Sequence, residues 1–314
     1  MDKEKHKATN LNDVVVKFSG DSGDGMQLTG TLFSDTSALF GNDVATFPDY
    51  PAEIRAPQGT VGGVSGFQVH IGHSKVDTPG DYADLLVAMN PAALKANKKY
   101  VKPGATIIVD IDAFTEKNIK KAGYKTLDPF TEDKLEDYHV LKVPVTTQTK
   151  DAVKDLGLDN KSVLRSKNMF CLGMVSFMFS RSLEPALDFF KTKFAKKPLV
   201  IEANTKVLKA GFNYAVNTHA IFAQKIAPAE ITKGRYRNIN GNQATAWGLM
   251  AAAEKANLPL FCGSYPITPA TDILQELSKH RYLGVKTFQA EDEIAGVSTA
   301  IGASFAGNFA VTTT

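Results

Sequence analysis

The most informative segment of this chain reads Gly263-Ser264-Tyr265-Pro266-Ile267-Thr268-Pro269. Its two prolines exclude a helix here, because proline lacks an N–H group and has a fixed φ angle. An apolar run over 258–262 comes just before the segment, and a helical pattern over 270–281 comes just after it. We therefore predict a rigid loop at the carboxyl end of a strand, which is where open α/β sheets bind their ligands.

The loop allows a functional and a purely structural interpretation. It offers a ligand one hydroxyl group, that of Thr268, beside the phenol of Tyr265. Alternatively, the segment is an ordinary strand-to-helix turn, in which Thr268 is the N-cap of the following helix and Pro269 is its first residue. Turn chemistry accounts for every residue, so the loop alone does not decide between the two interpretations.

An acidic helix start follows the loop in the sequence. It reads Glu291-Asp292-Glu293-Ile294-Ala295-Gly296 and continues into a run of small residues over 298–304. Carboxylates are favoured at the amino end of a helix, because the helix dipole is positive there. Glycine and alanine leave room for a ligand or another backbone to come close. The structural alternative is that all these acids, Glu293 included, serve only the helix dipole.

A glycine-rich turn lies near the start of the chain, between an expected strand and an expected helix. It reads Gly20-Asp21-Ser22-Gly23-Asp24-Gly25. A strand, a glycine-rich turn and a helix can hold a phosphate group, because N–H groups and the helix dipole both point at the anion. Gly20, Gly23 and Gly25 are therefore candidate binding residues, although the two aspartates oppose a simple nucleotide loop. The alternative is a tight turn whose glycines serve only close packing.

Strands and helices alternate along the whole chain, which indicates an α/β fold of two domains with parallel sheets under helical cover. A polar, turn-rich stretch over 227–240 is the expected linker, so 1–226 and 241–314 are the expected domains. Expected strands cover 14–18, 43–47, 64–71, 84–89, 105–111, 138–144, 258–262, 284–289 and 308–313. Expected helices lie near 26–40, 91–100, 147–157, 168–180, 183–194, 202–226, 241–255, 270–281 and 292–306.

The composition is typical of a cytoplasmic globular protein. Lys and Arg number 36 against 33 Asp and Glu, a balance that does not favour nucleic acid as a partner. The charged start has no apolar signal region behind it and no apolar run reaches membrane-spanning length, so we expect no membrane partner. The chain has only two cysteines, Cys171 and Cys262, whereas a four-iron cluster needs four thiolates. We therefore expect no metal site on this chain.

Taken together, the loop at 263–269 and the acidic segment at 291–296 resemble the pyrimidine-binding domain of thiamine-diphosphate enzymes. Their order and spacing are similar to those of one branch, the alpha subunit of the 2-oxoacid:ferredoxin (acceptor) oxidoreductases. The front of the chain resembles the gamma domain of the same enzymes. That resemblance rests on the glycine-rich turn and on Tyr50-Pro51-Ala52-Glu53-Ile54-Arg55, Asn90-Pro91, Asn168-Met169-Phe170 and Asn204. It implies an alpha subunit with a fused, amino-terminal gamma domain.

The resemblance also implies where the cofactors lie. Gly23-Asp24-Gly25 looks like half of the motif that holds Mg2+ and the diphosphate, but the asparagine that should follow at the family's distance is absent. The Mg2+, the diphosphate and the [4Fe-4S] cluster are therefore expected on a partner beta subunit. The chain ends at Thr314, inside the expected pyrimidine-binding domain, so we expect a fragment, a proteolysed chain or a subunit whose remainder is a separate polypeptide.

The function implied by the resemblance is reversible oxidative decarboxylation of a 2-oxoacid with coenzyme A, giving acyl-coenzyme A, CO2 and reduced ferredoxin. Glu293 would bind and activate thiamine diphosphate. Thr268 would contact the carboxylate or carbonyl of the 2-oxoacid, as part of the substrate-binding loop Tyr265-Pro266-Ile267-Thr268. Gly20, Gly23 and Gly25 would bind coenzyme A. We expect 2-oxoglutarate as the substrate, with pyruvate or a branched-chain 2-oxoacid as alternatives. An alternative of another class is a non-catalytic subunit that binds coenzyme A or serves assembly.

Overall fold

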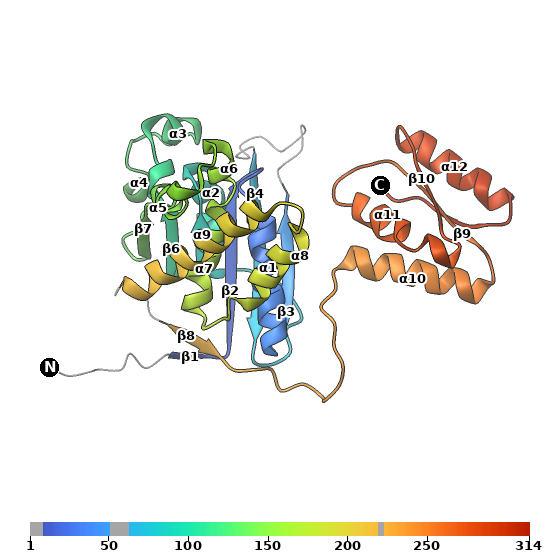
Figure 1. The fold of residues 1–314 in the computed structure, drawn as a ribbon, viewed down its shortest axis with the longest axis horizontal. Helices are drawn as coiled ribbons and strands as arrows, with labels where there is room; N and C mark the ends of the chain where they lie inside the picture. Colours follow the sequence, from blue (N-terminus) through green and yellow to red (C-terminus); the bar gives the residue numbers. More distant parts are fainter. Residues whose placement is uncertain (1–8, 51–62, 219–222) are drawn as a thin grey trace. The chain divides into compact units, whose positions relative to one another are not determined.

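The chain forms two compact units, Met1–Lys233 and Gly234–Thr314, in the computed structural model drawn in Figure 1. The structure describes residues 9–50, 63–218 and 223–314. Residues 51–55, part of the expected gamma-domain motif, lie outside this part of the chain. Among the helices of the described residues, none combines the length and the apolar character that crossing a membrane requires.

The first unit is built on a six-stranded sheet with the strand order β3-β4-β2-β5-β6-β7. Neighbours are parallel from β2 across to β7, whereas β4 is antiparallel to both β2 and β3. This strand departs from the expected parallel arrangement. The strands are β2 (Asp13–Asp21), β3 (Asp43–Asp49), β4 (Val64–Gly72), β5 (Ala83–Ala88), β6 (Val101–Asp110) and β7 (His139–Val143).

Helices cover both faces of this sheet (Figure 1). The main apolar core lies on one face, under α1 (Met26–Phe40), α7 (Lys167–Met178), α8 (Glu184–Lys193) and α9 (Pro198–Asn217). A smaller core lies on the other face, under α2 (Pro91–Asn97). The shorter helices are α3 (Glu116–Lys121), α4 (Pro129–Glu132), α5 (Val145–Ala152) and α6 (Asn160–Leu164).

The end of the first unit differs from the expected helix at 202–226. The helix α9 begins earlier, with Pro198 as its first residue, where the missing N–H and the fixed φ of proline are tolerated. It ends at Asn217, and the short strand β8 (Gln224–Ile226) pairs in parallel with β1 (Thr9–Leu11). Apolar periodicity does not distinguish a short strand from the last turn of a helix.

The helices α7 and α9 cross at a separation that only glycine permits. A β-carbon on Gly173 would overlap the carbonyl oxygen of Leu208, and one on Gly211 would overlap that of Phe170. With no side chain at either position, the two backbones touch and close the main core. The crossing also fixes the start of α7, where Lys167 lies beside the glycine-rich turn.

The winding of the chain reverses between β2 and β5. After β2 the chain passes through α1 to β3 on one side of the sheet, and after β5 it passes through α2 to β6 on the other side. The carboxyl ends of β2 and β5 pair side by side, with Ser19 opposite Ala88. Such a switch point leaves a crevice for ligands in open α/β sheets, and the turn over residues 20–25 lies there.

Residues 227–230 are hydrogen-bonded to the first unit. The Asn42 Nδ2 donates to the carbonyl oxygen of Ala227 (2.6 Å). The Ala229 N–H donates to the carbonyl oxygen of Gly41 (2.8 Å), and the Glu230 N–H donates to that of His73 (3.0 Å). The first residues of the expected linker are therefore attached to the first unit.

The second unit contains a three-stranded parallel sheet with the order β10-β9-β11. Every strand and helix expected after residue 240 is present. The elements are α10 (Gly241–Ala256), β9 (Leu260–Ser264), α11 (Thr271–Ser278), β10 (Lys286–Gln289), α12 (Glu293–Phe305) and β11 (Phe309–Val311). With both units built from mostly parallel strands and covering helices, the predicted α/β fold class is confirmed.

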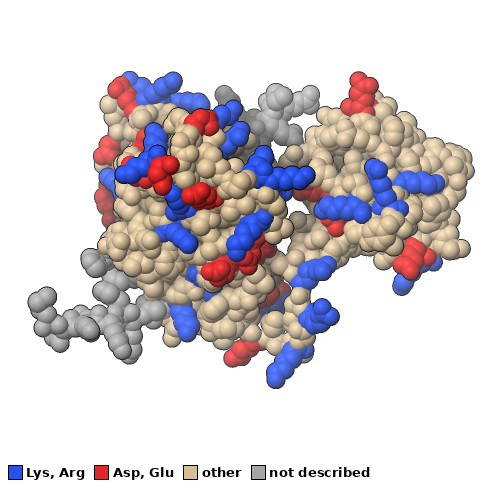
Figure 2. Space-filling model, in the orientation of Figure 1, with Lys and Arg blue, Asp and Glu red and all other residues tan. Residues whose placement is uncertain are grey.

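Charged side chains of both signs are mixed on the first unit. On the face shown in Figure 2, Lys and Arg are interspersed with Asp and Glu. Several form exposed pairs, such as Lys206 with Asp155 (2.6 Å) and Lys191 with Asp188 (2.9 Å). Exposed pairs of this kind contribute little to stability, and the mixed surface agrees with a formal net charge of only +3.

Candidate functional site

Two loops leave the carboxyl edge of the second sheet side by side. The central strand is β9, and β10 pairs with it in parallel, with Gln289 opposite Ser264. The Ala290 N–H donates a hydrogen bond to the Ser264 carbonyl oxygen (2.8 Å), which holds the two strand exits together. The segments 265–269 and 290–292 therefore emerge at the edge where parallel sheets bind ligands.

A glycine of β9 lets the amino end of α12 lie against this edge. A β-carbon on Gly263 would overlap Thr299 Oγ1 and lie 3.1 Å from the carbonyl oxygen of Gly296. A β-carbon on Gly296 would lie 3.6 Å from the backbone nitrogen of Tyr265, an ordinary van der Waals contact. The absence of a side chain at Gly263 thus lets α12 approach β9. Glu293, the first residue of α12, is in this way brought to the edge that carries the loop.

The acidic residues at this helix start have different surroundings. Asp292 is the N-cap of α12, and its Oδ1 accepts a hydrogen bond from the Ala295 N–H (2.7 Å). Glu291 and Glu293 are exposed, and neither carboxylate has a hydrogen bond or an ion pair within the described residues. Asp292 therefore serves as a cap, whereas the Glu293 carboxylate stands in the first turn of α12 without a partner among the described residues.

The loop does not follow the turn chemistry that was the alternative to a binding site. The helix α11 begins at Thr271 with Ala270 as its N-cap, so Thr268 does not cap it and Pro269 is not its first residue. The Ile267 carbonyl oxygen accepts hydrogen bonds from the N–H and the hydroxyl of Thr271, both at 2.8 Å. Thr268 is exposed, and its hydroxyl has no partner in the part of the chain that the structure describes.

A third strand end joins this edge through Ser264, which sequence analysis did not single out. Its Oγ lies 2.7 Å from Thr313 Oγ1 and also donates to the Thr313 carbonyl oxygen. Ser264 is completely buried, so this contact ties the residues after β11 to the end of β9. The signal in the sequence was a single hydroxyl residue closing an otherwise apolar strand.

In the first unit, several N–H donors of the glycine-rich turn are used within the chain. The Asp24 Oδ2 accepts a hydrogen bond from the Asp21 N–H (2.8 Å), and the Ser22 N–H donates to the Gly63 carbonyl oxygen (3.0 Å). Gly23 and Gly25 have φ angles of +103° and +76°, which side-chain-bearing residues rarely adopt. The turn therefore needs these two glycines for its backbone path, whatever it binds.

A lysine that no local sequence pattern indicates lies beside this turn. Lys167 Nζ lies 3.0 Å from Asp24 Oδ1, and the two side chains are mostly buried, with 15% of Lys167 and 16% of Asp24 exposed. The next residue, Asn168, donates from Nδ2 to the Gly25 carbonyl oxygen (3.2 Å). Asn90 contacts the turn as well, donating from Nδ2 to Asp21 Oδ1 (2.8 Å). The switch point thus combines carboxylates, amides and one partly buried cation.

The described residues contain no group of three or more His, Cys, Asp or Glu side chains that could hold a metal ion. Cys171 and Cys262 are both buried and free. Burial raises the pKa of the Cys262 thiol to about 11 and also raises that of Cys171. Both sulfurs are therefore protonated at neutral pH and enclosed by protein.

Comparison with known families covers most of the chain. Residues 15–214 match the family described as pyruvate ferredoxin/flavodoxin oxidoreductase. The chain belongs to this family. Residues 252–314 match the thiamine-diphosphate-binding domain of pyruvate flavodoxin/ferredoxin oxidoreductase. The predicted resemblance is confirmed, and the glycine-rich turn and the site of the second unit each lie within one of these matched regions.

Two curated relatives of this chain have names that refer to 2-oxoacids. The 2-oxoglutarate oxidoreductase subunit KorA of Mycobacterium tuberculosis is 52% identical and aligns with 97% of this chain and 47% of its own length. The 2-oxoacid:ferredoxin oxidoreductase 1 subunit alpha of Aeropyrum pernix is 26% identical over 96% of this chain and 50% of its own. The chain therefore spans about half the length of these relatives.

A solved structure in the same family has a similar fold. It is the 2-oxoglutarate:ferredoxin oxidoreductase of Magnetococcus marinus with 2-oxoglutarate, coenzyme A and succinyl-CoA bound. The sequences are 27% identical, the TM-score is 0.68, and the match covers 96% of this chain and 47% of that one.

Proposed function

We propose that this chain is the alpha subunit, with a fused gamma domain, of a thiamine-diphosphate-dependent 2-oxoacid:ferredoxin oxidoreductase. The observation that carries the proposal is the edge of the second sheet, where an available carboxylate, Glu293, and an available hydroxyl, Thr268, emerge from neighbouring strand ends. Membership of the family supports it. The names of the relatives favour 2-oxoglutarate over pyruvate as the substrate.

The two units would divide the work. Residues 1–226 are proposed as the gamma domain and 241–314 as the first part of the pyrimidine-binding domain. Thiamine diphosphate, when bound, would supply the electron sink for the electron pair left by loss of CO2. Glu293 would hydrogen-bond to the aminopyrimidine ring nitrogen and hold a proton between its carboxyl group and that nitrogen. The Thr268 hydroxyl would bind the 2-oxoacid carboxylate or carbonyl, in a loop whose Tyr265, Pro266 and Ile267 line the same site.

The residues present fit such a cofactor, and we expect a second subunit to complete its binding site. The proposed cofactor-binding carboxylate stands at the exposed amino end of α12, and exposed apolar side chains follow at helical spacing along the same helix. Ile294 is 76% exposed, Ile301 54% and Phe305 92%. Exposed apolar patches on a folded protein mark interaction sites. We propose that the beta subunit covers it and carries the diphosphate, the Mg2+ and the [4Fe-4S] cluster.

Coenzyme A is proposed to bind at the switch point of the first unit. The turn at residues 20–25 opens a helix of 15 residues, α1, and has a partly buried cation, Lys167, beside it. Because Asp24 already occupies both the Asp21 N–H and Lys167, a phosphate group would take the place of the Asp24 carboxylate. In this proposal the glycines give the turn its backbone path, and the Asp24 carboxylate occupies the anion site when no coenzyme A is bound.

Replacing Glu293 by glutamine tests the main proposal. Glu293→Gln keeps the shape and a hydrogen-bonding end but removes the acid, and it is measured in the full-length alpha subunit assembled with its beta subunit. We expect decarboxylation to slow by roughly 10²-fold or more, the usual effect of losing a positioned proton-transfer group. Proton–deuterium exchange at the thiazolium carbon should slow in parallel, while assembly of the subunits remains normal.

Glu291→Gln is the matched control, because Glu291 is also exposed, lies two residues away and is equally unpaired in the described residues. We expect it to change turnover and proton exchange little. If Glu291→Gln slows the exchange and Glu293→Gln does not, the wrong carboxylate has been chosen. If neither variant slows it, the acidic segment is structural and the proposed catalytic role of this unit is lost.

A further inference from the structure

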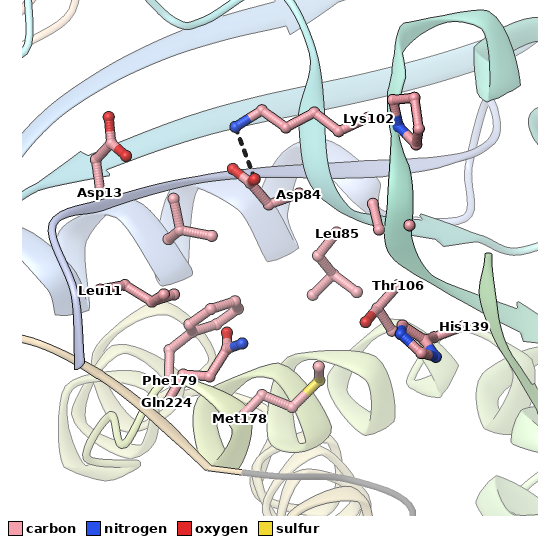
Figure 3. Close-up of a pocket in the computed structure, with 14 residues that line it drawn as sticks. Leu11, Asp13, Asp84, Leu85, Lys102, Thr106, His139, Met178, Phe179 and Gln224 are labelled. Carbon is pink, nitrogen blue, oxygen red and sulfur yellow. Dashed lines mark hydrogen bonds and ion pairs between the residues drawn. The ribbon is translucent and has the colours of Figure 1, made fainter. Parts of the chain in front are cut away.

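A half-open hollow of about 390 Å³ lies at the amino edge of the first sheet, beside a register shift in the pairing of β5 with β6 (Figure 3). Two of the residues that line it, Leu85 and Phe179, are each 1% exposed and belong to the main core. At its rim, Asp84 Oδ1 is already paired with Lys102 Nζ (2.7 Å). The hollow therefore offers a ligand little free surface, in contrast to the carboxyl edge of the second sheet, where Thr268 is exposed.

The proposed substrate-binding loop is held at its far end through two of its carbonyl groups. The Ile267 carbonyl oxygen accepts hydrogen bonds from the N–H and the hydroxyl of Thr271, both at 2.8 Å. The Pro269 carbonyl oxygen accepts a hydrogen bond from Asn242 Nδ2 (2.9 Å). These bonds fix the residues on either side of Thr268 and leave its hydroxyl free among the described residues.

The near end of the same loop depends on one side chain, that of Ser264. The backbone pairing of β9 with β11 ends at Cys262 opposite Val311. Two residues beyond that pair, the Ser264 Oγ donates to the Thr313 carbonyl oxygen and lies 2.7 Å from Thr313 Oγ1. The Ser264 hydroxyl has only one hydrogen, so the Thr313 hydroxyl is the donor in the second contact. Side chains thus hold the two segments together where the backbone pairing has ended.

The hydroxyl and the carbonyl group of Ser264 serve different neighbours. Its carbonyl oxygen accepts a hydrogen bond from the Ala290 N–H (2.8 Å), which holds the segment that leads to Glu293. Asp292 then caps α12 with its own carboxylate. Neither contact uses the Ser264 hydroxyl. Removal of that hydroxyl should therefore release residues 312–313 from the base of the loop and leave Glu293 in place.

We propose that Ser264 is a positioning residue for the 2-oxoacid, because its hydroxyl holds the loop in the conformation that presents the Thr268 hydroxyl to the substrate. The inference rests on the proposed function, in which Thr268 binds the 2-oxoacid. Ser264 is completely buried, so it acts on the substrate only through the loop. When the binding-competent conformation of a protein is only partly populated, the apparent affinity falls by that fraction.

Ser264→Ala, in the full-length alpha subunit assembled with its beta subunit, tests this inference. The substitution removes two hydrogen bonds, which together shift a local equilibrium by roughly tenfold or more. We expect the KM for the 2-oxoacid to rise by about this factor, with kcat and proton–deuterium exchange at the thiazolium carbon close to the parent values. In the enzyme without substrate, thermolysin, which cuts before apolar residues, should cleave at Ile267 faster, as mass spectrometry of the fragments would show.

Two substitutions of Thr313 separate the hydrogen bonds from the shape of the side chain. Thr313→Ser keeps both hydrogen bonds and should keep the KM near the parent value, whereas Thr313→Val removes one and should raise the KM by a smaller factor than Ser264→Ala. The matched control is Ser278→Ala, because the Ser278 hydroxyl also donates to a carbonyl oxygen, that of Gln275 (2.7 Å), but at the opposite end of α11 from the loop. It should leave the KM unchanged.

An unchanged KM in Ser264→Ala overturns the inference, and a lowered Tm beside it would mean that the contact serves stability alone. Cleavage at Ile267 at the parent rate overturns it too, since the loop would then be held without the hydroxyl. Slower thiazolium exchange in Ser264→Ala would place the effect on the Glu293 side instead. Failure of the proposed function is distinguishable, because Glu293→Gln would then leave that exchange unchanged, and the inference would be lost with it.

Discussion

Lys167 places a positive charge beside the glycine-rich turn, which the sequence around the turn does not indicate. It lies at the start of α7, far from the glycine-rich turn in the sequence, yet its Nζ is 3.0 Å from Asp24 Oδ1. The pairing neutralises a carboxylate that would otherwise oppose a phosphate group. A phosphate that replaces Asp24 would gain a charge-assisted bond to the same cation, which is stronger than a bond between neutral groups.

We expect Lys167→Met to raise the KM for coenzyme A by about tenfold or more, because a hydrogen bond to a charged group contributes about 1.5–3 kcal/mol. The KM for the 2-oxoacid should change little. Steady-state kinetics of the assembled enzyme measure both values. Lys161→Met, at an exposed position of α6, is the control. Equal changes in the two KM values with a lowered Tm would mean that Lys167 serves packing alone.

Glu276 gives the second unit a measurable response to acid. Hydrogen bonds from Lys279 Nζ (2.7 Å) and from the Trp247 indole N–H (2.9 Å) lower the pKa of its carboxyl to about 2. Such a group stabilises the fold above the pKa of the unfolded chain, near 4.5, and loses that contribution as the pH falls toward 2. We expect the Tm of the second unit to fall across this range and Glu276→Gln to flatten the profile.

The control for this experiment is Glu254→Gln, because Glu254 is exposed on α10 of the same unit. Thermal unfolding followed by near-UV circular dichroism between pH 2 and 5 reports on Trp247, the one tryptophan of the chain. An identical profile for the two variants would show that the contacts of Glu276 do not stabilise the folded state.

At the scale of elements, the crossing of α7 and α9 depends on two glycines. A β-carbon on Gly211 would overlap the Phe170 carbonyl oxygen, and backbone atoms cannot turn aside as a flexible side chain can. We expect Gly211→Ala to destabilise the first unit by about 2–3 kcal/mol or more, as overpacking does. Urea unfolding monitored by far-UV circular dichroism measures the change.

Gly248→Ala is the control for the crossing, since a β-carbon on Gly248 meets no atom within 4 Å. Alanine is the better helix former, so this variant should be neutral or more stable by up to about 1 kcal/mol. A Gly211→Ala chain as stable as the parent would mean that the two helices can separate without cost.

The elements also show which parts of the fold were predictable from sequence. The strand before the loop and the helix after the acidic segment were expected from apolar runs bounded by proline, glycine or acids, and both are present. The short helices α3, α4 and α6 were missed, because four to six residues are too few for helical periodicity. The antiparallel β4 and the register shift between β5 and β6 were missed too, since pairing partners and register depend on distant parts of the chain.

The candidate site was predictable in its motifs and not in its contacts. The loop and Glu293 follow from local patterns, whereas the distinction between Asp292 as a cap and Glu293 as an available carboxylate needed the structure. The structure was also needed for Thr268, which is not the N-cap because α11 begins only at Thr271. Ser264 acquires its role only through Thr313, a partner 49 residues away.

At the scale of the whole molecule, the two cysteines are too few to bind a four-iron cluster. Cys171 and Cys262 are buried in separate units, and burial raises the pKa of both thiols. We expect the purified chain to be colourless and free of iron and acid-labile sulfide, because a four-iron cluster needs four thiolates. Elemental analysis and visible absorption spectroscopy check this.

The control is the double variant Cys171→Ala, Cys262→Ala, whose spectrum should match that of the parent chain. Stoichiometric iron and sulfide in the parent, lost in the double variant, would contradict the assignment of the cluster to a partner subunit.

The hydrogen bonds at residues 227–230 also have a consequence for hydrogen exchange. The Ala229 N–H donates to the Gly41 carbonyl oxygen and the Glu230 N–H to the His73 carbonyl oxygen. An amide proton held in this way exchanges with solvent only when the local structure opens. The exchange rates of these two amides therefore report how often this segment separates from the first unit.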